Sequence, residues 1–109
     1  MKLKVTGRHM EVSDQLQEYI ENKVTKLSRI YPALIETGVV VERDRFQYVT
    51  EVSVHAKPFD LFGRGRNENV NQSVLASLKK VERQLVKHKE RMQEHKGKGP
   101  QTALPEESV

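Results

Sequence analysis

Hydrophobic and polar residues follow two different periods along this chain. Residues 2–5 read Lys-Leu-Lys-Val, and this period of two is typical of a half-buried strand. Apolar residues then recur every three or four positions, which predicts a helix over residues 14–31. Ser13 or Asp14 is a suitable N-cap, and Pro32 ends the helical pattern.

The middle of the chain has the pattern of three more strands. After an expected turn at residues 36–38, three valines begin a strand over residues 39–43. Alternation over residues 46–56 predicts the next strand, and residues 59–66 predict a last one whose two glycines are typical of an edge or bulged strand. Helical spacing returns over residues 68–94.

This order of elements predicts the fold class. A strand, a helix, three strands and a helix favour an α/β (α+β) two-layer sandwich, with two helices on one face of a four-stranded sheet. The first strand–helix–strand unit is expected to be a right-handed crossover. A chain of 109 residues supports one modest core, so we expect a single domain over residues 1–96 and a short flexible tail over residues 97–109.

Composition excludes several classes of site. The chain has no cysteine, which excludes disulfides, thiolate zinc sites and a cysteine nucleophile. No apolar run approaches the roughly 18 residues of a membrane helix, and no signal peptide is evident, so we expect a cytoplasmic protein with no membrane contact. No nucleophile–base pair is evident, so we expect no catalytic residues, no enzyme activity and no cofactor. The histidines lack ligand spacing, so no metal site is expected at His9, His55, His88 or His95.

Positive charge is concentrated near the C-terminus. The chain has 19 basic and 15 acidic residues, a net charge of +4. Residues 79–96 hold seven basic and three acidic residues, which is +4, whereas residues 1–78 carry +1 and residues 97–109 carry −1. The excess charge therefore lies on one predicted helix, which indicates an anionic partner.

On that helix the cations and the apolar residues occupy nearly opposite faces. At about 100° per residue, five cations fall within about 120°, and the apolar stripe lies opposite. An ordinary solvated face would interleave charges of both signs, so this stripe favours phosphate binding. Its members are Lys79, Lys80, Arg83, Lys87 and Arg91, and the apolar residues opposite are Val70, Val74, Leu78, Val81, Leu85 and Met92.

Other cations and aromatic residues are weaker candidates. Lys23, Lys26 and Arg29 form a ridge on the first helix, and Arg64 and Arg66 on the last strand are secondary candidates to flank the basic surface. Ordinary surface cations are the alternative for each. Four aromatic residues interleave with the sheet, where packing is the favoured interpretation and base stacking the alternative: Phe46, Tyr48, Phe59 and Phe62.

Two separated segments resemble one known family. They are MKLKVTGRHMEVSDQLQEYIENKVTKLSRIY at the start and LKKVERQLVKHKERM near the end. The chain resembles short members of the family of ribosome hibernation promoting factors and ribosome-associated inhibitor A, also called the sigma-factor modulation or S30Ae family. The family commonly has Asp-Met-Tyr where residues 69–71 here read Asn-Val-Asn, so the aromatic residue is missing.

The resemblance implies both a fold and a function. It implies a β-α-β-β-β-α domain similar to double-stranded-RNA-binding domains. It also implies a monomer that binds the small ribosomal subunit and 16S rRNA, with no small-molecule substrate, and that inhibits translation by occluding the channel of mRNA and of A- and P-site tRNA. Carried over by position, the RNA-binding residues are Lys23, Lys26, Arg29, Lys80, Arg83, Lys87, Lys89 and Arg91. Lys89 lies nearer the apolar side of the helix than the others.

Two other functions remain open at this point. One is a protein-interaction module that modulates a transcription or stress factor, for which weak salt dependence and no need for RNA are expected. The other is a generic double-stranded-RNA binder, for which any A-form duplex should bind as well as a ribosome.

Overall fold

The chain folds in the predicted order of strand, helix, three strands and helix. The structure is a computed structural model that describes residues 1–98, with side chains described through Arg91. The elements are β1 (Lys2–Arg8), α1 (Asp14–Ile30), β2 (Leu34–Asp44), β3 (Gln47–Ala56), β4 (Asp60–Asn67) and α2 (Val70–Lys98). Ser13 is the N-cap of α1, where its Oγ accepts a hydrogen bond from the Leu16 amide at 3.1 Å.

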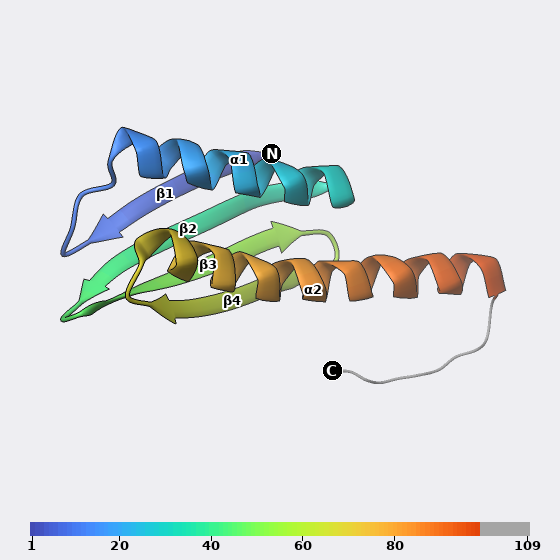
Figure 1. Cartoon of the computed structure of the whole chain (residues 1–109). Coiled ribbons are helices and arrows are strands. Elements are labelled where there is room, and N and C mark those ends of the chain that lie inside the picture. Colours follow the sequence, from blue (N-terminus) through green and yellow to red (C-terminus); the bar gives the residue numbers. More distant parts are fainter. Residues whose placement is uncertain (99–109) are drawn as a thin grey trace.

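One mixed sheet and two helices form the two layers. The strand order is β1-β2-β3-β4, with β1 parallel to β2 and the other neighbours antiparallel. Val39 and Val52 pair across the centre of the sheet. Both helices cover the same face and run in the same direction (Figure 1). The predicted fold class is therefore confirmed, and we call the uncovered side of the sheet the open face.

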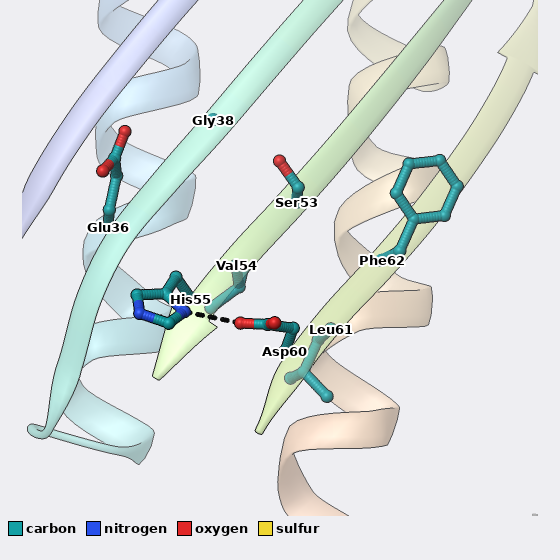
Figure 2. A pocket seen from close by; sticks show the side chains of 8 residues that line it. All are labelled: Glu36, Gly38, Ser53, Val54, His55, Asp60, Leu61 and Phe62. Carbon is teal, nitrogen blue, oxygen red and sulfur yellow. Dashed lines mark hydrogen bonds and ion pairs between the residues drawn. The ribbon is translucent and has the colours of Figure 1, made fainter. Parts of the chain in front are cut away.

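The hand of the β1-α1-β2 crossover differs from the prediction. In Figure 2 the sheet is seen from the open face with β2 running upward, β1 to its left and the helices behind. A path up β1, down behind the sheet and up β2 to the right is left-handed, so the right-handed expectation is wrong here. The chain reverses in a short connection after β1, where His9 adopts a positive φ of 59° and Gly7 admits the Met10 carbonyl oxygen, 2.5 Å from where a Cβ would lie. Left-handed crossovers are uncommon, and in this protein the crossover follows this tight connection.

Two predicted boundaries are also wrong. β2 begins at Leu34 rather than at residue 39, and the expected turn at residues 36–38 is part of the strand. Thr37 is fully buried there and its hydroxyl donates to the Met1 sulfur at 3.1 Å, so a tertiary environment accommodates a polar residue. α2 continues through Gly97 to Lys98 rather than ending near residue 94. The remainder of the expected tail, residues 99–109, lies outside the described residues.

The core lies between the sheet and the helices. Its centre contains Ile20 of α1, Val41 and Val52 of the sheet and Leu85 of α2, none of them exposed to solvent. The predicted apolar stripe of α2 is confirmed through Leu85, with Val70 partly buried, whereas the side chain of Met92 lies outside the described residues. Because apolar residues alternate along the strands, the polar residues are left on the open face.

Close packing of backbone against backbone positions α2 over β4. A Cβ on Gly63 would lie less than 2.5 Å from the Ser77 carbonyl oxygen, and one on Gly65 would lie 2.5 Å from that of Ser73. The two glycines therefore let the helix approach the strand more closely than any larger residue would allow.

Candidate nucleic-acid interface

The five predicted cations of α2 form one exposed surface in the structure. Lys79, Lys80, Arg83, Lys87 and Arg91 are all exposed, and we call this set the basic stripe. Glu90 is exposed at a position within the stripe, as its helical spacing predicts. The residues that sequence reasoning assigned to one face of α2 are therefore brought together.

One flank of the basic stripe lies over the free edge of β4. Lys80 Nζ donates to the carbonyl oxygen of Arg64 at 2.6 Å. One turn further, Gln84 bonds both backbone groups of Phe62: its Nε2 donates to the carbonyl at 2.9 Å, and its Oε1 accepts from the amide at 3.4 Å. Lys87 and Arg91 follow on this flank at helical spacing. The stripe thus extends from the outer side of α2 to the edge of the sheet.

The charges of the basic stripe have no acidic partner within the described part of the chain. Among the side chains of residues 1–91, no carboxylate lies within ion-pair distance of any member of the stripe. Like charges at i,i+4 spacing on a helix destabilise it slightly, and an anion bound along the stripe would relieve that repulsion.

The predicted cations of α1 lie on the same covered side of the sheet. Lys26 and Arg29 are exposed, whereas Lys23 is half-buried with its Nζ 5.4 Å from the centre of the Tyr19 ring. α1 and α2 are neighbours in this layer (Figure 1). Lys89 is half-buried, in agreement with its position near the apolar side of α2. The helix layer therefore presents cations from both helices.

The two secondary candidates lie on the open face instead. Arg64 Nε is 3.6 Å from Glu51 Oε2, and Arg66 Nη1 is 3.1 Å from Asp44 Oδ2. Only the backbone of Arg64 meets the basic stripe, through Lys80. Their role in RNA binding remains a prediction, and each has an acid within ion-pair distance, which no member of the basic stripe has among residues 1–91.

A shallow hollow occupies the open face near the start of β4. Gly38 and Ser53 form its floor, and Phe62 rises at one side (Figure 2). At its lower end His55 Nδ1 lies 2.5 Å from Asp60 Oδ1, and Glu36 stands on the neighbouring strand. The hollow is wide, its lining is more apolar than polar, and two of its polar side chains, Glu36 and Asp60, are acids, so it lacks an array of donors that would hold a phosphate.

The packing interpretation of the aromatic residues is wrong for two of the four. Phe46 is 83% exposed and Phe62 is 53% exposed, whereas Phe59 packs against the core. Phe46 lies in the turn between β2 and β3. Phe62 follows buried Leu61 in β4, so its side chain points to the opposite face of the sheet. The alternation of side chains along β4 could have predicted from the sequence that Phe62 is exposed.

An aromatic stack closes the space between the end of α1 and α2. The Tyr31 and Phe59 rings are 5.5 Å apart, and Phe59 stacks on His88 of α2 at 4.1 Å. Burial lowers the pKa of His88 below its ordinary value, and the positive charge of Arg91 lowers it further. His88 is therefore held neutral beside the basic stripe at neutral pH.

The described residues offer little for other kinds of site. Among the side chains of residues 1–91, three or more histidine or acidic groups do not gather as they would around a metal ion. His95 was also expected to bind no metal, and its side chain lies outside the described residues. The helices of residues 1–98 are too short or too polar to cross a membrane.

Comparison with known proteins identifies similar sequences across most of the chain. A family described as "Sigma 54 modulation protein / S30EA ribosomal protein" matches residues 3–93. The ribosome hibernation promoting factor of Azotobacter vinelandii is 24% identical over 91 residues, which are 84% of this chain and 85% of that protein. The protein of the same name from Escherichia coli K12 is 22% identical over 95 residues, 87% of this chain and 100% of that protein.

Two solved structures have the same fold. A ribosomal subunit interface protein from Coxiella burnetii superposes with a TM-score of 0.77 at 18% identity, covering 83% of this chain and 99% of that one. The N-terminal domain of Thermus thermophilus Protein Y gives 0.76 at 19% identity, covering 81% and 99%. At these identities the likeness establishes the arrangement of strands and helices.

Proposed function

This chain belongs to the sigma 54 modulation and S30EA ribosomal protein family, and from that premise we propose that it binds the small ribosomal subunit through the basic stripe. Bound there, the domain occupies the channel used by mRNA and by A- and P-site tRNA, and so keeps the ribosome inactive. Relatives named as ribosome hibernation promoting factors support this proposal. It requires no chemical step, because occupancy alone inhibits.

The observation that carries the proposal is the set of five exposed cations on α2 that have no acidic partner among the side chains of residues 1–91. Cations that neutralise phosphates release condensed counterions, which makes affinity fall steeply with salt. Lys26 and Arg29 of α1 lie in the same layer and extend the positive surface. Phosphate contacts of this kind fix the position of the protein without reading base identity.

The shape of the domain favours a confined RNA site over a free duplex. The molecule measures 49 × 24 × 16 Å, so it is long and flat. The 29 residues of α2 span about 43 Å at 1.5 Å per residue, well beyond the roughly 26 Å of the eight-residue β4 beneath it. A projecting helix of this length can be contacted by RNA on several sides, as the walls of a channel would provide.

Charge reversal within the basic stripe tests the proposal. We expect Lys79→Glu, Arg83→Glu and Lys87→Glu together to abolish co-sedimentation with purified small subunits while circular dichroism stays unchanged. Lys80 is left in place because its Nζ also bonds a backbone carbonyl of β4. Binding by the folded triple variant would refute the basic stripe as the binding surface.

A matched control separates the location of charge from its amount. Lys2→Glu, Lys4→Glu and Lys57→Glu replace three exposed lysines elsewhere. Each replacement removes two positive charges, so both triple variants change the net charge from +4 to −2. The control variant should bind nearly as well as the unaltered protein if position decides binding.

The same experiment distinguishes the alternative functions. A free A-form RNA duplex that binds as tightly as the subunit would indicate a generic double-stranded-RNA binder. Absence of binding to either RNA would favour a protein-interaction module. Binding to the small subunit that survives moderate salt, with little binding to the duplex, supports the proposal.

A further inference from the structure

An aromatic side chain stands fully in solvent at the tip of the β2–β3 hairpin. Asp44 pairs with Gln47, so Arg45 and Phe46 alone form the turn. Phe46 is 83% exposed, and the residues on both sides of it in the chain are polar. An exposed phenylalanine forgoes the free energy that burial would supply, and the fold does not use this ring.

The tip is braced from one side by Arg43. Its Nε donates to the Arg45 carbonyl at 2.9 Å, and its Nη1 donates to the Tyr48 hydroxyl at 2.5 Å. The guanidinium also lies 4.8 Å from the centre of the Tyr48 ring. These contacts hold the backbone beside Phe46 in one conformation, so a ligand that stacks on Phe46 would lose little loop entropy on binding.

Charge at the tip favours an anionic ligand. The carboxylate of Asp44 is engaged by Arg66, at 3.1 Å. Arg45 is exposed, and no acid of residues 1–91 lies within ion-pair distance of it. Arg45 also has a φ of 60°, a conformation in which glycine is the usual residue of such a turn. Among the described side chains, a cation without an acidic partner thus stands next to an aromatic ring without a stacking partner.

We propose that Phe46 stacks on an unpaired nucleobase of the bound RNA while Arg45 contacts a phosphate next to it. This inference rests on the proposed function and adds a contact outside the helices. The turn lies at the end of the molecule where α2 begins (Figure 1), away from the basic stripe further along the helix. A single ring suffices for stacking on a base.

A protein pocket is the less favoured partner for this tip. Protein interfaces bury a cluster of apolar residues, and Phe46 has no such cluster around it. The other exposed apolar side chains of the sheet, Ile35 and Phe62, lie toward the opposite ends of their strands. Arg45 and the ring together instead match the two chemical parts of a nucleotide.

A fluorescent reporter tests the contact directly. The chain has no tryptophan, so Phe46→Trp introduces a single indole at the tip. On addition of purified small ribosomal subunits we expect its emission to be quenched by roughly half or more, as base stacking requires. The matched variant is Phe62→Trp on the open face, whose emission should stay unchanged. Emission from the tip that does not change while the protein binds would overturn the inference.

Affinity measurements distinguish base stacking from an apolar pocket. Loss of the aromatic ring in Phe46→Leu should weaken binding about 5- to 100-fold, whereas Phe46→Tyr should stay within about twofold. Affinity retained by the leucine variant and lost by the tyrosine variant would show an apolar pocket and overturn the inference. If the unaltered protein binds and all variants bind equally, this inference fails alone; if the unaltered protein does not bind, the proposed function fails with it.

Discussion

Cations on the two sides of the sheet are held in opposite ways. On the helix layer, the five members of the basic stripe lie on one helix, and no carboxylate among residues 1–91 is within ion-pair distance of them. On the open face, Arg8, Arg64 and Arg66 each face an acid of another strand, at 3.6, 3.6 and 3.1 Å. The open face is close to internally neutralised, whereas the helix layer is not.

This difference shows that the placement of charge, more than its amount, marks a binding surface. Exposed ion pairs add little stability, so the pairing on the open face is weak evidence about folding. The pairing does affect ligand binding, because a phosphate approaching Arg64 has to compete with Glu51 for the guanidinium. A phosphate approaching Arg83 meets no such competitor among the described side chains.

The largest effect we predict comes from a methyl group added on the helix side of the sheet. Gly65→Ala should lower the free energy of unfolding by about 2–3 kcal/mol, because the new Cβ would lie 2.5 Å from the Ser73 backbone oxygen and α2 would have to move. Urea denaturation measures the loss.

The same substitution on the open face is its control. A Cβ on Gly38 would lie 3.2 Å from the Ser53 hydroxyl, which can rotate away. Gly38→Ala should therefore change stability by less than about 0.5 kcal/mol. Equal losses at the two glycines would contradict the asymmetry between the two faces of the sheet.

A smaller effect is expected from single charges, measured through the salt dependence of binding to small subunits. Arg83→Gln should reduce the slope of log affinity against log salt by about 0.7–1, the contribution of one phosphate contact. Arg64→Gln should reduce it by less, because Glu51 competes for that guanidinium.

The ion pair itself can be opened to sharpen this comparison. Glu51→Gln leaves Arg64 without its acid, so the salt dependence should become steeper than that of the unaltered protein. A slope that does not change would mean that RNA does not reach Arg64 at all.

The smallest effect concerns pH and His88. Because the pKa of His88 is lowered in the folded state, the unfolded chain binds a proton more readily below about pH 6.5. Stability should thus be constant above that pH and should fall as the pH decreases toward the lowered pKa. Urea midpoints at about pH 7.5 and about pH 5.5 measure the difference.

Two variants test the cause of this pH dependence. His88→Phe keeps a ring against Phe59 and should remove the contribution. Arg91→Gln removes only the smaller cause of the lowered pKa and should reduce the contribution in part. A pH dependence that is the same in all three proteins would show that another group is responsible.

Sequence periodicity was sufficient for the type and order of the elements and for the basic stripe, although not for the start of β2 or the end of α2. The cations and apolar residues of α2 share a single period, so one helical projection places both sets. Of the three cations predicted to form a ridge on α1, Lys26 and Arg29 are exposed, whereas Lys23 is half-buried. These predictions depend on local geometry, which neighbouring residues determine.

Features that depend on contacts between elements could not be predicted in the same way. The acids that face Arg64 and Arg66 come from other strands, and strand register is invisible to a helical projection. Buried Thr37 appeared to belong to a turn because its place in the sheet is decided by β1 and β3. Phe46 was assigned to the start of a strand because the expected two-residue connection, residues 44–45, lies one position before the observed turn of Arg45 and Phe46.

Gln84 and Lys80 protect the free edge of β4 from association with other molecules. A sheet of this kind has two outer strands, and unpaired backbone groups on an outer strand invite a strand from another molecule, which is a route to aggregation. The two side chains occupy the outward amide and carbonyl of Phe62 and the carbonyl of Arg64, so β4 is blocked along part of its length. On the other side, β1 has Lys2 and Lys4 at alternate positions, charges that discourage strand addition. Loss of Gln84 should therefore open an aggregation route at β4 before it affects folding.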